Sequence, residues 1–271
     1  MQTKLRKVAI IGVGHVGSHC ALALVREQLL NELILVDIDR DKAEGHAEDL
    51  RDTLPHLSRP VQIRTGEYQD CVGADIIVIS AGVQPRKGMT RPEMLWETLP
   101  IMDTIIDPVI RSGFSGIFVV ISNPVDVIAN YIYQKSGFPP SRVIGTGTAL
   151  DSARLQRILA DALKIKPANI NAFCMGEHGD SQMVPWSHVT VEGVPLKQYL
   201  ASLSGEVDPP DLDAIVLQTT RTGYGIVNGK GATEFGIAAA TCKIVSALFQ
   251  GIDSVMPVSV YLQGEWGQEG F

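Results

Sequence analysis

The composition describes an ordinary globular chain. Its 271 residues allow one large domain or two modest ones, and 45% hydrophobic residues suffice for a core. A formal net charge of −7, without any block of lysine or arginine, argues against nucleic acid or an anionic membrane surface as a partner. The chain shows no signal peptide and no apolar run of about 18 residues, so we expect a cytoplasmic protein.

Four cysteines are scattered along the chain without the spacing of metal ligands. We therefore expect no metal site and no disulfide framework. Buried cysteines behave as small hydrophobic residues, and we expect that role here.

The first half of the chain alternates between short apolar runs and helical patterns. The pattern predicts strands over 8–11, 33–36, 61–64, 76–80, 117–121 and 142–145, with helices over 16–29, 40–53, 93–112 and 148–163. Such alternation is typical of an α/β fold with a Rossmann-type, doubly wound parallel sheet. The strict alternation ceases beyond about residue 163. With a boundary near residue 145, the pattern predicts a nucleotide-binding domain over 1–145 and a mixed α+β catalytic domain over 146–271.

A glycine-rich turn follows the first predicted strand and precedes a helix rich in Ala and Leu. The first glycine permits a tight turn, the second lets the backbone approach a pyrophosphate, and the third lets the helix pack closely on the strand. The turn therefore predicts a dinucleotide site, made by Gly12, Val13, Gly14, His15, Val16 and Gly17.

A carboxylate follows the second predicted strand. Asp37 lies twenty residues after Gly17, where its side chain can accept hydrogen bonds from the adenosine ribose. Its charge would repel a ribose 2′-phosphate, so NAD is favoured over NADP, although Arg40 argues the other way. Ligands of such sheets bind at the carboxyl ends of the strands, where the residues are small or polar and include Ala81, Gly82 and Asn123.

Three residues of the second half match the needs of 2-oxo acid reduction by NADH. His178 can donate the proton, because its ordinary pKa lies close to neutral pH. Asp151 can bind the other ring nitrogen, and Arg154 can pair with a substrate carboxylate through its planar fork. Their spacing of three residues puts Asp151 and Arg154 on one helix face. A surface ion pair and a plain loop histidine are the alternative interpretations.

Five motifs occur in one order along the chain, namely Gly12-Val13-Gly14-His15-Val16-Gly17, Ile121-Ser122-Asn123-Pro124-Val125-Asp126, Thr148-Ala149-Leu150-Asp151-Ser152-Ala153-Arg154, Gly176-Glu177-His178-Gly179-Asp180-Ser181 and Lys230-Gly231-Ala232-Thr233. With them the chain resembles the L-lactate/malate dehydrogenase family over nearly its whole length, and within it the L-lactate (L-2-hydroxy acid) dehydrogenases. The resemblance implies an NAD-dependent oxidoreductase that acts on a small 2-oxo or 2-hydroxy acid and assembles as a homodimer or homotetramer.

The same resemblance assigns roles to individual residues. His178 would be the proton donor, with Asp151 as its partner and Arg154 as the carboxylate anchor. Arg91 would swing in from a loop to polarise the carbonyl, as part of a mobile lid over residues 82–95. Asn123 would contact the substrate oxygen or the nicotinamide ribose. Two more residues would border the reacting groups, Thr233 in the substrate pocket and Ile237 near the nicotinamide.

The lid departs from the family pattern at the position that separates lactate enzymes from malate enzymes. The family has Gln or Arg there, respectively, and this chain has Pro85, flanked by Gln84 and Arg86. Without a cation for a second carboxylate, monocarboxylic 2-oxo acids such as pyruvate are favoured. A malate dehydrogenase that uses Arg86 is one alternative. A non-catalytic NAD-binding relative is another, although such a protein would have no need of His178 and its partners.

Two further departures concern regulation and length. Gln156 and Asn171 stand where sugar-bisphosphate-activated members carry an arginine and a histidine, so we expect no activation by fructose 1,6-bisphosphate. The family also continues for some tens of residues beyond the position of Phe271. We therefore expect a chain of this length to leave apolar surface of the second domain uncovered.

Overall fold

The computed structural model describes residues 5–83, 88–203, 208–251 and 254–270. Contacts divide the chain into two compact units, which are described separately. The first comprises Met1–Thr146, Ile237–Ser254 and Ser259–Phe271, and the second Gly147–Gly236 and Val255–Val258. The domain limits 1–145 and 146–271 stay a prediction, and the contacts group Ile237–Ser254 with the first unit instead of the second.

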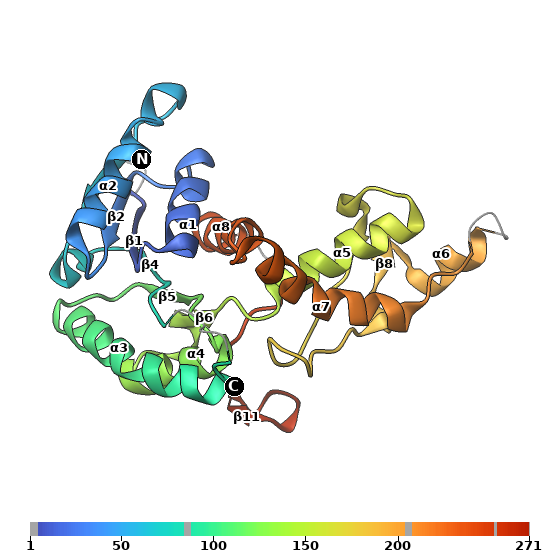
Figure 1. Cartoon of the computed structure of the whole chain (residues 1–271). Helices are drawn as coiled ribbons and strands as arrows, with labels where there is room; N and C mark the ends of the chain where they lie inside the picture. Colours follow the sequence, from blue (N-terminus) through green and yellow to red (C-terminus); the bar gives the residue numbers. More distant parts are fainter. Residues whose placement is uncertain (1–4, 84–87, 204–207, 252–253, 271) are drawn as a thin grey trace. The chain divides into compact units, whose positions relative to one another are not determined.

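A six-stranded parallel sheet forms the centre of the first unit (Figure 1). Its spatial order is β3-β2-β1-β4-β5-β6, with bounds Lys7–Ile11 (β1), Glu32–Val36 (β2), Gln62–Thr65 (β3), Ile76–Ile79 (β4), Ile117–Val120 (β5) and Val143–Gly145 (β6). The central strands β1, β2, β4 and β5 consist mostly of buried apolar residues, as expected for strands that helices cover on both faces of a sheet, whereas the edge strand β3 is mostly polar. This architecture confirms the predicted Rossmann-type fold.

Helices α3 (Arg91–Arg111) and α4 (Val125–Ser136) lie side by side on one face of this sheet (Figure 1). The core beneath them is aliphatic and aromatic, with Met102, Ile105, Ile128, Ile132 and Phe118 among its buried members. Helices α1 (His15–Arg26) and α2 (Arg40–Arg51) connect β1 to β2 and β2 to β3. Helix α8 (Phe235–Gln250) contacts α1 through a side-chain hydrogen bond between Thr241 and Cys20.

Helix α4, which follows β5 directly, is absent from the elements predicted from the sequence. Buried residues on this helix are Val125, Ile128, Ala129 and Ile132, an i, i+3, i+4, i+7 pattern. Gly137 ends the helix at φ +66°, the left-handed conformation that glycine adopts without strain. Both signals are present in the sequence, so this helix was predictable.

The start of α3 also differs from the expectation. The helix begins at Arg91 instead of residue 93, so Arg91 is the first helical residue and does not lie in a loop. Thr90 caps the helix by accepting a hydrogen bond from the Glu93 backbone N–H, and the Glu93 carboxylate accepts one from the Thr90 N–H at 2.8 Å.

The second unit combines two long helices with a small antiparallel sheet. Helices α5 (Ala149–Leu163) and α7 (Leu212–Lys230) pack together, and α6 (Leu196–Ser202) lies close to the sheet. The strands are Ile170–Asn171 (β7), Thr190–Val191 (β8) and Val194–Pro195 (β9). This mixed composition agrees with the predicted α+β character.

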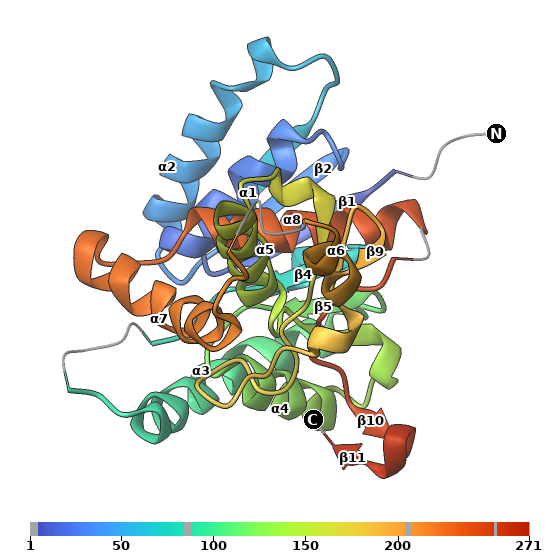
Figure 2. The same cartoon turned by 90° about the vertical axis from the view of Figure 1, so that its right-hand side faces the viewer.

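Two short strands, Leu262–Gln263 (β10) and Glu269–Gly270 (β11), pair as a hairpin near the C-terminus (Figure 2). All four cysteines are free and buried, which confirms their expected role. None of the helices in the described ranges is long and apolar enough to span a bilayer.

Candidate active site

In the turn between β1 and α1, other backbone atoms lie so close to two of the glycines that a side chain would not fit there. A Cβ on Gly12, whose φ is +91°, would lie 2.5 Å from the backbone nitrogen of Ala81. A Cβ on Gly17 would lie 1.9 Å from the carbonyl oxygen of Gly12. Gly14 differs, because the nearest atom to its Cβ position is the Lys42 Nζ, at 4.0 Å. Open space therefore remains at the start of α1, where backbone N–H groups can bind a pyrophosphate.

Asp37 lies directly after β2, beside this turn. Its Oδ2 accepts a hydrogen bond from the Val13 backbone N–H at 2.8 Å, and its Oδ1 accepts one from the Asp39 N–H at 3.1 Å. Each oxygen keeps a second lone pair for a ribose hydroxyl. The Lys42 Nζ lies 3.7 Å from Oδ2. The sequence analysis missed Lys42, although its place in the first turn of α2 was a usable signal.

The neighbouring strands end in the small and polar residues that were expected there. Ala81 and Gly82 follow β4, and the Ser122 hydroxyl, which follows β5, donates to the carbonyl oxygen of Ala81. Asn123 is exposed beside them, and its bond to Pro124 is cis. The edge of the sheet, the open turn and the Asp37 carboxylate together fit a dinucleotide.

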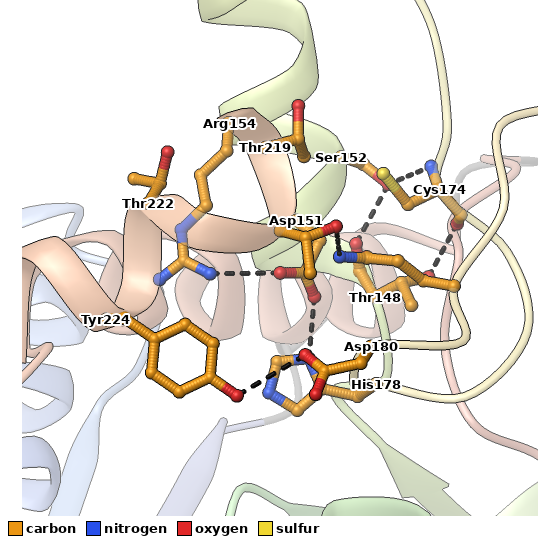
Figure 3. A network of polar contacts seen from close by, with 12 residues as sticks. Thr148, Asp151, Ser152, Arg154, Cys174, His178, Asp180, Thr219, Thr222 and Tyr224 are labelled. Atoms are coloured by element: carbon orange, nitrogen blue, oxygen red, sulfur yellow. Dashed lines mark hydrogen bonds and ion pairs between the residues drawn. The ribbon is translucent and has the colours of Figure 1, made fainter. Parts of the chain in front are cut away.

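The second unit brings together His178, Asp151 and Arg154 (Figure 3). The His178 Nδ1 lies 2.6 Å from the Asp151 Oδ2, and the Arg154 Nη1 donates to the Asp151 Oδ1 at 2.9 Å. Asp151 stands in the first turn of α5 with only 4% of its side chain exposed. One buried carboxylate thus binds both the histidine and the arginine, which favours a built site over a surface ion pair.

The loop that carries His178 is fastened at its base. Met175 and Met183 form an antiparallel bridge, in which each backbone N–H donates to the other residue's carbonyl oxygen. Just before the loop, the Cys174 N–H donates to the Ser152 hydroxyl and the Cys174 carbonyl accepts from the Thr148 hydroxyl, at 2.8 and 2.6 Å (Figure 3). Ser152 and Thr148 belong to the start of α5, so the loop and Asp151 share one support.

Burial would by itself raise the pKa of Asp151, because a buried carboxylate loses its hydration. The hydrogen bond and charge of His178, together with the charge of Arg154, outweigh this effect and lower the pKa below its usual value. Asp151 is therefore ionised at neutral pH. The Arg154 Nε is buried without a hydrogen-bond partner among the described residues, so one donor of this guanidinium is left unsatisfied at the site.

Helix α7 borders the arginine, and the sequence analysis missed its contribution. A Cβ on Gly223 would lie 3.4 Å from both terminal nitrogens of Arg154, so the glycine leaves room beside the guanidinium. A glycine in a helix interior usually has a packing or functional reason, and this was the available signal. The hydroxyl of the next residue, Tyr224, donates to Asp180 of the histidine loop at 3.3 Å.

The other predicted site residues are spread over both units. Thr233 lies between α7 and α8 in the second unit, whereas Ile237 and Arg91 belong to the first. The side chain of Arg91 lies outside the described part of the chain, as does Arg86 as a whole. The roles of these four residues stay predictions.

The two positions considered for sugar-bisphosphate activation carry no charge. The Gln156 amide donates to the carbonyl oxygen of Ala172 at 3.0 Å, and Asn171 is exposed on β7. The absence of this activation stays a prediction.

Comparisons with known proteins identify both halves of the chain. The model of the lactate/malate dehydrogenase NAD-binding domain matches residues 6–145, and that of the family's α/β C-terminal domain matches residues 148–271. The chain belongs to the lactate/malate dehydrogenase family. As a family member it contains an NAD-binding domain, which confirms NAD as the predicted cofactor.

Several relatives in this family resemble the chain over almost its entire length. L-lactate dehydrogenase 3 of Bacillus cereus is 42% identical over 268 residues, which cover 99% of this chain and 85% of the relative. L-lactate dehydrogenase 2 of Lactococcus lactis is 40% identical and covers 100% and 86%, respectively. The solved minor L-lactate dehydrogenase of Enterococcus mundtii, in its ligand-bound form, superposes with a TM-score of 0.93 at 39% identity and covers 98% and 85%.

Proposed function

We propose that this protein is an NAD-dependent L-lactate dehydrogenase, which reversibly converts pyruvate and L-lactate. The observation that carries the proposal is the buried Asp151, which binds the His178 Nδ1 at 2.6 Å and the Arg154 Nη1 at 2.9 Å. The L-lactate dehydrogenases of Bacillus cereus and Lactococcus lactis, similar at 40–42% identity, support the same activity.

His178 acts as the acid in the direction of pyruvate reduction. An Nδ1–H that donates to ionised Asp151 leaves Nε2 to deliver a proton to the carbonyl oxygen. The carboxylate fixes this orientation of the ring and stabilises its protonated form. In the reverse direction Nε2 takes the proton back from the hydroxyl group.

Arg154 holds the substrate carboxylate in this mechanism. Its Nη1 is bound to Asp151, and the remaining donors of the planar fork can pair with both carboxylate oxygens. NAD held at the glycine turn and Asp37 would supply or accept the hydride. We assign to Arg91 the polarisation of the carbonyl, and to Thr233 a place in the wall of the pocket.

The substrate class follows from the charge of the pocket. A second carboxylate, as in oxaloacetate, needs its own cation, because a buried and unpaired carboxylate costs several kcal/mol (about 2 or more). Pro85 provides none at the position where the family discriminates. Arg86 is the nearby cation of the lid that could serve instead.

Steady-state kinetics with pyruvate, 2-oxoisocaproate and oxaloacetate test this assignment, each measured by NADH absorbance. We expect the highest kcat/KM for a monocarboxylic acid, with pyruvate first. A preference for oxaloacetate that disappears in Arg86→Gln would make the protein a malate dehydrogenase. Tight NADH binding without turnover of any of the three acids would make it a non-catalytic relative.

We further propose that the protein assembles as a homodimer or homotetramer. Support comes from the family and from large apolar side chains on the surface, such as Trp96 and Ile38, at 71% and 97% exposed. Light scattering coupled to gel filtration measures the assembly, and a monomer at micromolar concentration would contradict the proposal.

A further inference from the structure

Two cations lie close to the carboxylate that recognises the adenosine ribose. Arg40 and Lys42 follow Asp37 by three and five residues, at the start of α2. Cations at this place are what a ribose 2′-phosphate requires, so these residues would by themselves favour NADP. The chain nevertheless belongs to a family whose domain binds NAD.

Each of the two cations has a carboxylate partner in the structure. The Lys42 Nζ lies 3.7 Å from the Asp37 Oδ2. The Arg40 guanidinium forms an ion pair and hydrogen bond with Glu67, through Nη2 and Oε1. Asp37 thus pairs with Lys42, and Glu67 pairs with Arg40.

The sheet explains why Glu67 reaches Arg40. Strands β2 and β3 are parallel neighbours, and Leu35 pairs with Thr65 in their register. Two residues beyond this pair stand Asp37 and Glu67, so both carboxylates project from the same edge of the sheet.

A reciprocal pair of hydrogen bonds holds Glu67 in place. Glu67 immediately precedes the short 3₁₀-helix Tyr68–Cys71, and its backbone carbonyl accepts from the Asp70 N–H at 3.0 Å. The Asp70 carboxylate accepts from the Glu67 N–H at 2.8 Å. These two hydrogen bonds fix the backbone of Glu67, so its side chain extends toward Arg40 from a defined position.

We propose that Glu67 is a second determinant of cofactor choice, which keeps Arg40 from binding a ribose 2′-phosphate. Discrimination against NADP is then shared between Asp37 and Glu67 at the ends of adjacent strands. The pair is exposed, with side-chain exposures of 78% for Arg40 and 53% for Glu67, so water and salt weaken its electrostatic effect. The inference rests on the NAD-binding part of the proposed function and on no part of the substrate chemistry.

The test compares the dissociation constants of NADH and NADPH in fluorescence titrations of the whole chain. The variant Glu67→Gln removes one charge but keeps the length of the side chain and both backbone hydrogen bonds between residues 67 and 70. We expect NADPH to bind about 3- to 10-fold more tightly, as Coulomb energies near a surface imply for one charge over this distance, while NADH affinity stays constant. The gain should shrink at high ionic strength, and it should add to the gain from Asp37→Ser.

Two controls separate this effect from a general loss of negative charge. Glu48→Gln breaks another carboxylate–arginine pair of α2, between Glu48 and Arg51, and should leave NADPH affinity unchanged. Arg40→Gln combined with Glu67→Gln should abolish the gain, because the freed cation is then missing.

Three outcomes would overturn the inference. They are an unchanged NADPH constant in Glu67→Gln, an equal gain in Glu48→Gln, and a parallel loss of NADH affinity in Glu67→Gln. Failure of the wild-type protein to bind NADH would instead refute the cofactor assignment, and titration of NADH alone distinguishes that result from the other three.

Discussion

The glycine turn and the histidine cluster are two sites made in different ways. The turn requires glycines, which lack a Cβ, since a Cβ on Gly17 would lie 1.9 Å from the Gly12 carbonyl oxygen. The cluster depends on charges, since the buried Asp151 is shared by His178 and Arg154. Added bulk should therefore damage the first site and leave the second intact. Altered charge or hydrogen bonding should do the reverse.

Among the substitutions that separate the two sites, His178→Ala should have the largest effect. Loss of the proton donor should lower kcat about 10²- to 10⁴-fold, the range that general acid catalysis supplies. NADH affinity should stay close to wild type, because the residues that fit the cofactor lie on the other unit. Stopped-flow turnover and fluorescence titration measure the two quantities.

His188→Ala is the matched control, since His188 is an exposed histidine of the same unit. Its kcat should equal that of the wild type. Retention of more than about a tenth of the rate in His178→Ala would remove this residue from the mechanism.

Arg154→Lys keeps the charge but loses the planar fork. We expect a loss of about 2 to 5 kcal/mol in transition-state binding, visible as a lower kcat/KM for pyruvate, because an ill-paired buried charge remains. Arg157→Lys, on the exposed side of the same helix α5, should change nothing. Equal kinetics for the two variants would mean that the substrate carboxylate is held elsewhere.

The glycine turn is tested by comparing two of its own members. Gly17→Ala should destabilise the fold by about 1 to 3 kcal/mol in urea unfolding, because the added methyl meets the Gly12 carbonyl. Gly14→Ala has open space around it, so its unfolding free energy should change by less than about 0.5 kcal/mol. Its NADH affinity should nevertheless fall. Equal stabilities for the two variants would refute this reading of the turn.

A smaller effect is expected in the acid stability of the cluster. The pKa of Asp151 is lowered in the fold, so its ionised form stabilises the folded chain above the carboxyl's ordinary pKa of about 3.9. This stabilisation is lost as the pH falls through the lower pKa of the folded state. Asp151→Asn lacks the titrating group, and its unfolding free energy should fall less steeply below about pH 4.

Urea unfolding at a series of pH values measures these slopes. Asp161→Asn, at the exposed end of α5, should keep the slope of the wild type. If Asp151→Asn keeps it as well, the carboxyl gains no stabilisation from its two partners.

The parts of the molecule that depend on local pattern were predictable from the sequence. The parallel Rossmann-type sheet, the glycine turn and the helix face shared by Asp151 and Arg154 all follow from spacing along the chain. Contacts between distant segments were not predictable in this way. Gly223 lies beside Arg154, and Glu67 pairs with Arg40. No local sequence pattern predicts either contact, because tertiary packing decides both.

The helix α4 is a different kind of miss. Its apolar spacing and its terminal Gly137 are local signals that the sequence already contains. The helical position of Arg91 is similar, since Thr90 and Glu93 form a capping box, whose residue types and spacing are present in the sequence.

Most of helix α8 belongs to the first unit but follows the second unit in the sequence. During synthesis, the first unit can therefore be completed only after the second unit has been made. Cys20, fully buried on α1, has its hydrogen-bond partner Thr241 on α8, and the Arg6 guanidinium donates to the carbonyl oxygen of Phe249 at 2.9 Å. A ribosome makes these partners more than two hundred residues after their counterparts. The nucleotide-binding unit is the first to begin folding, but it stays uncovered until the whole second unit has been translated.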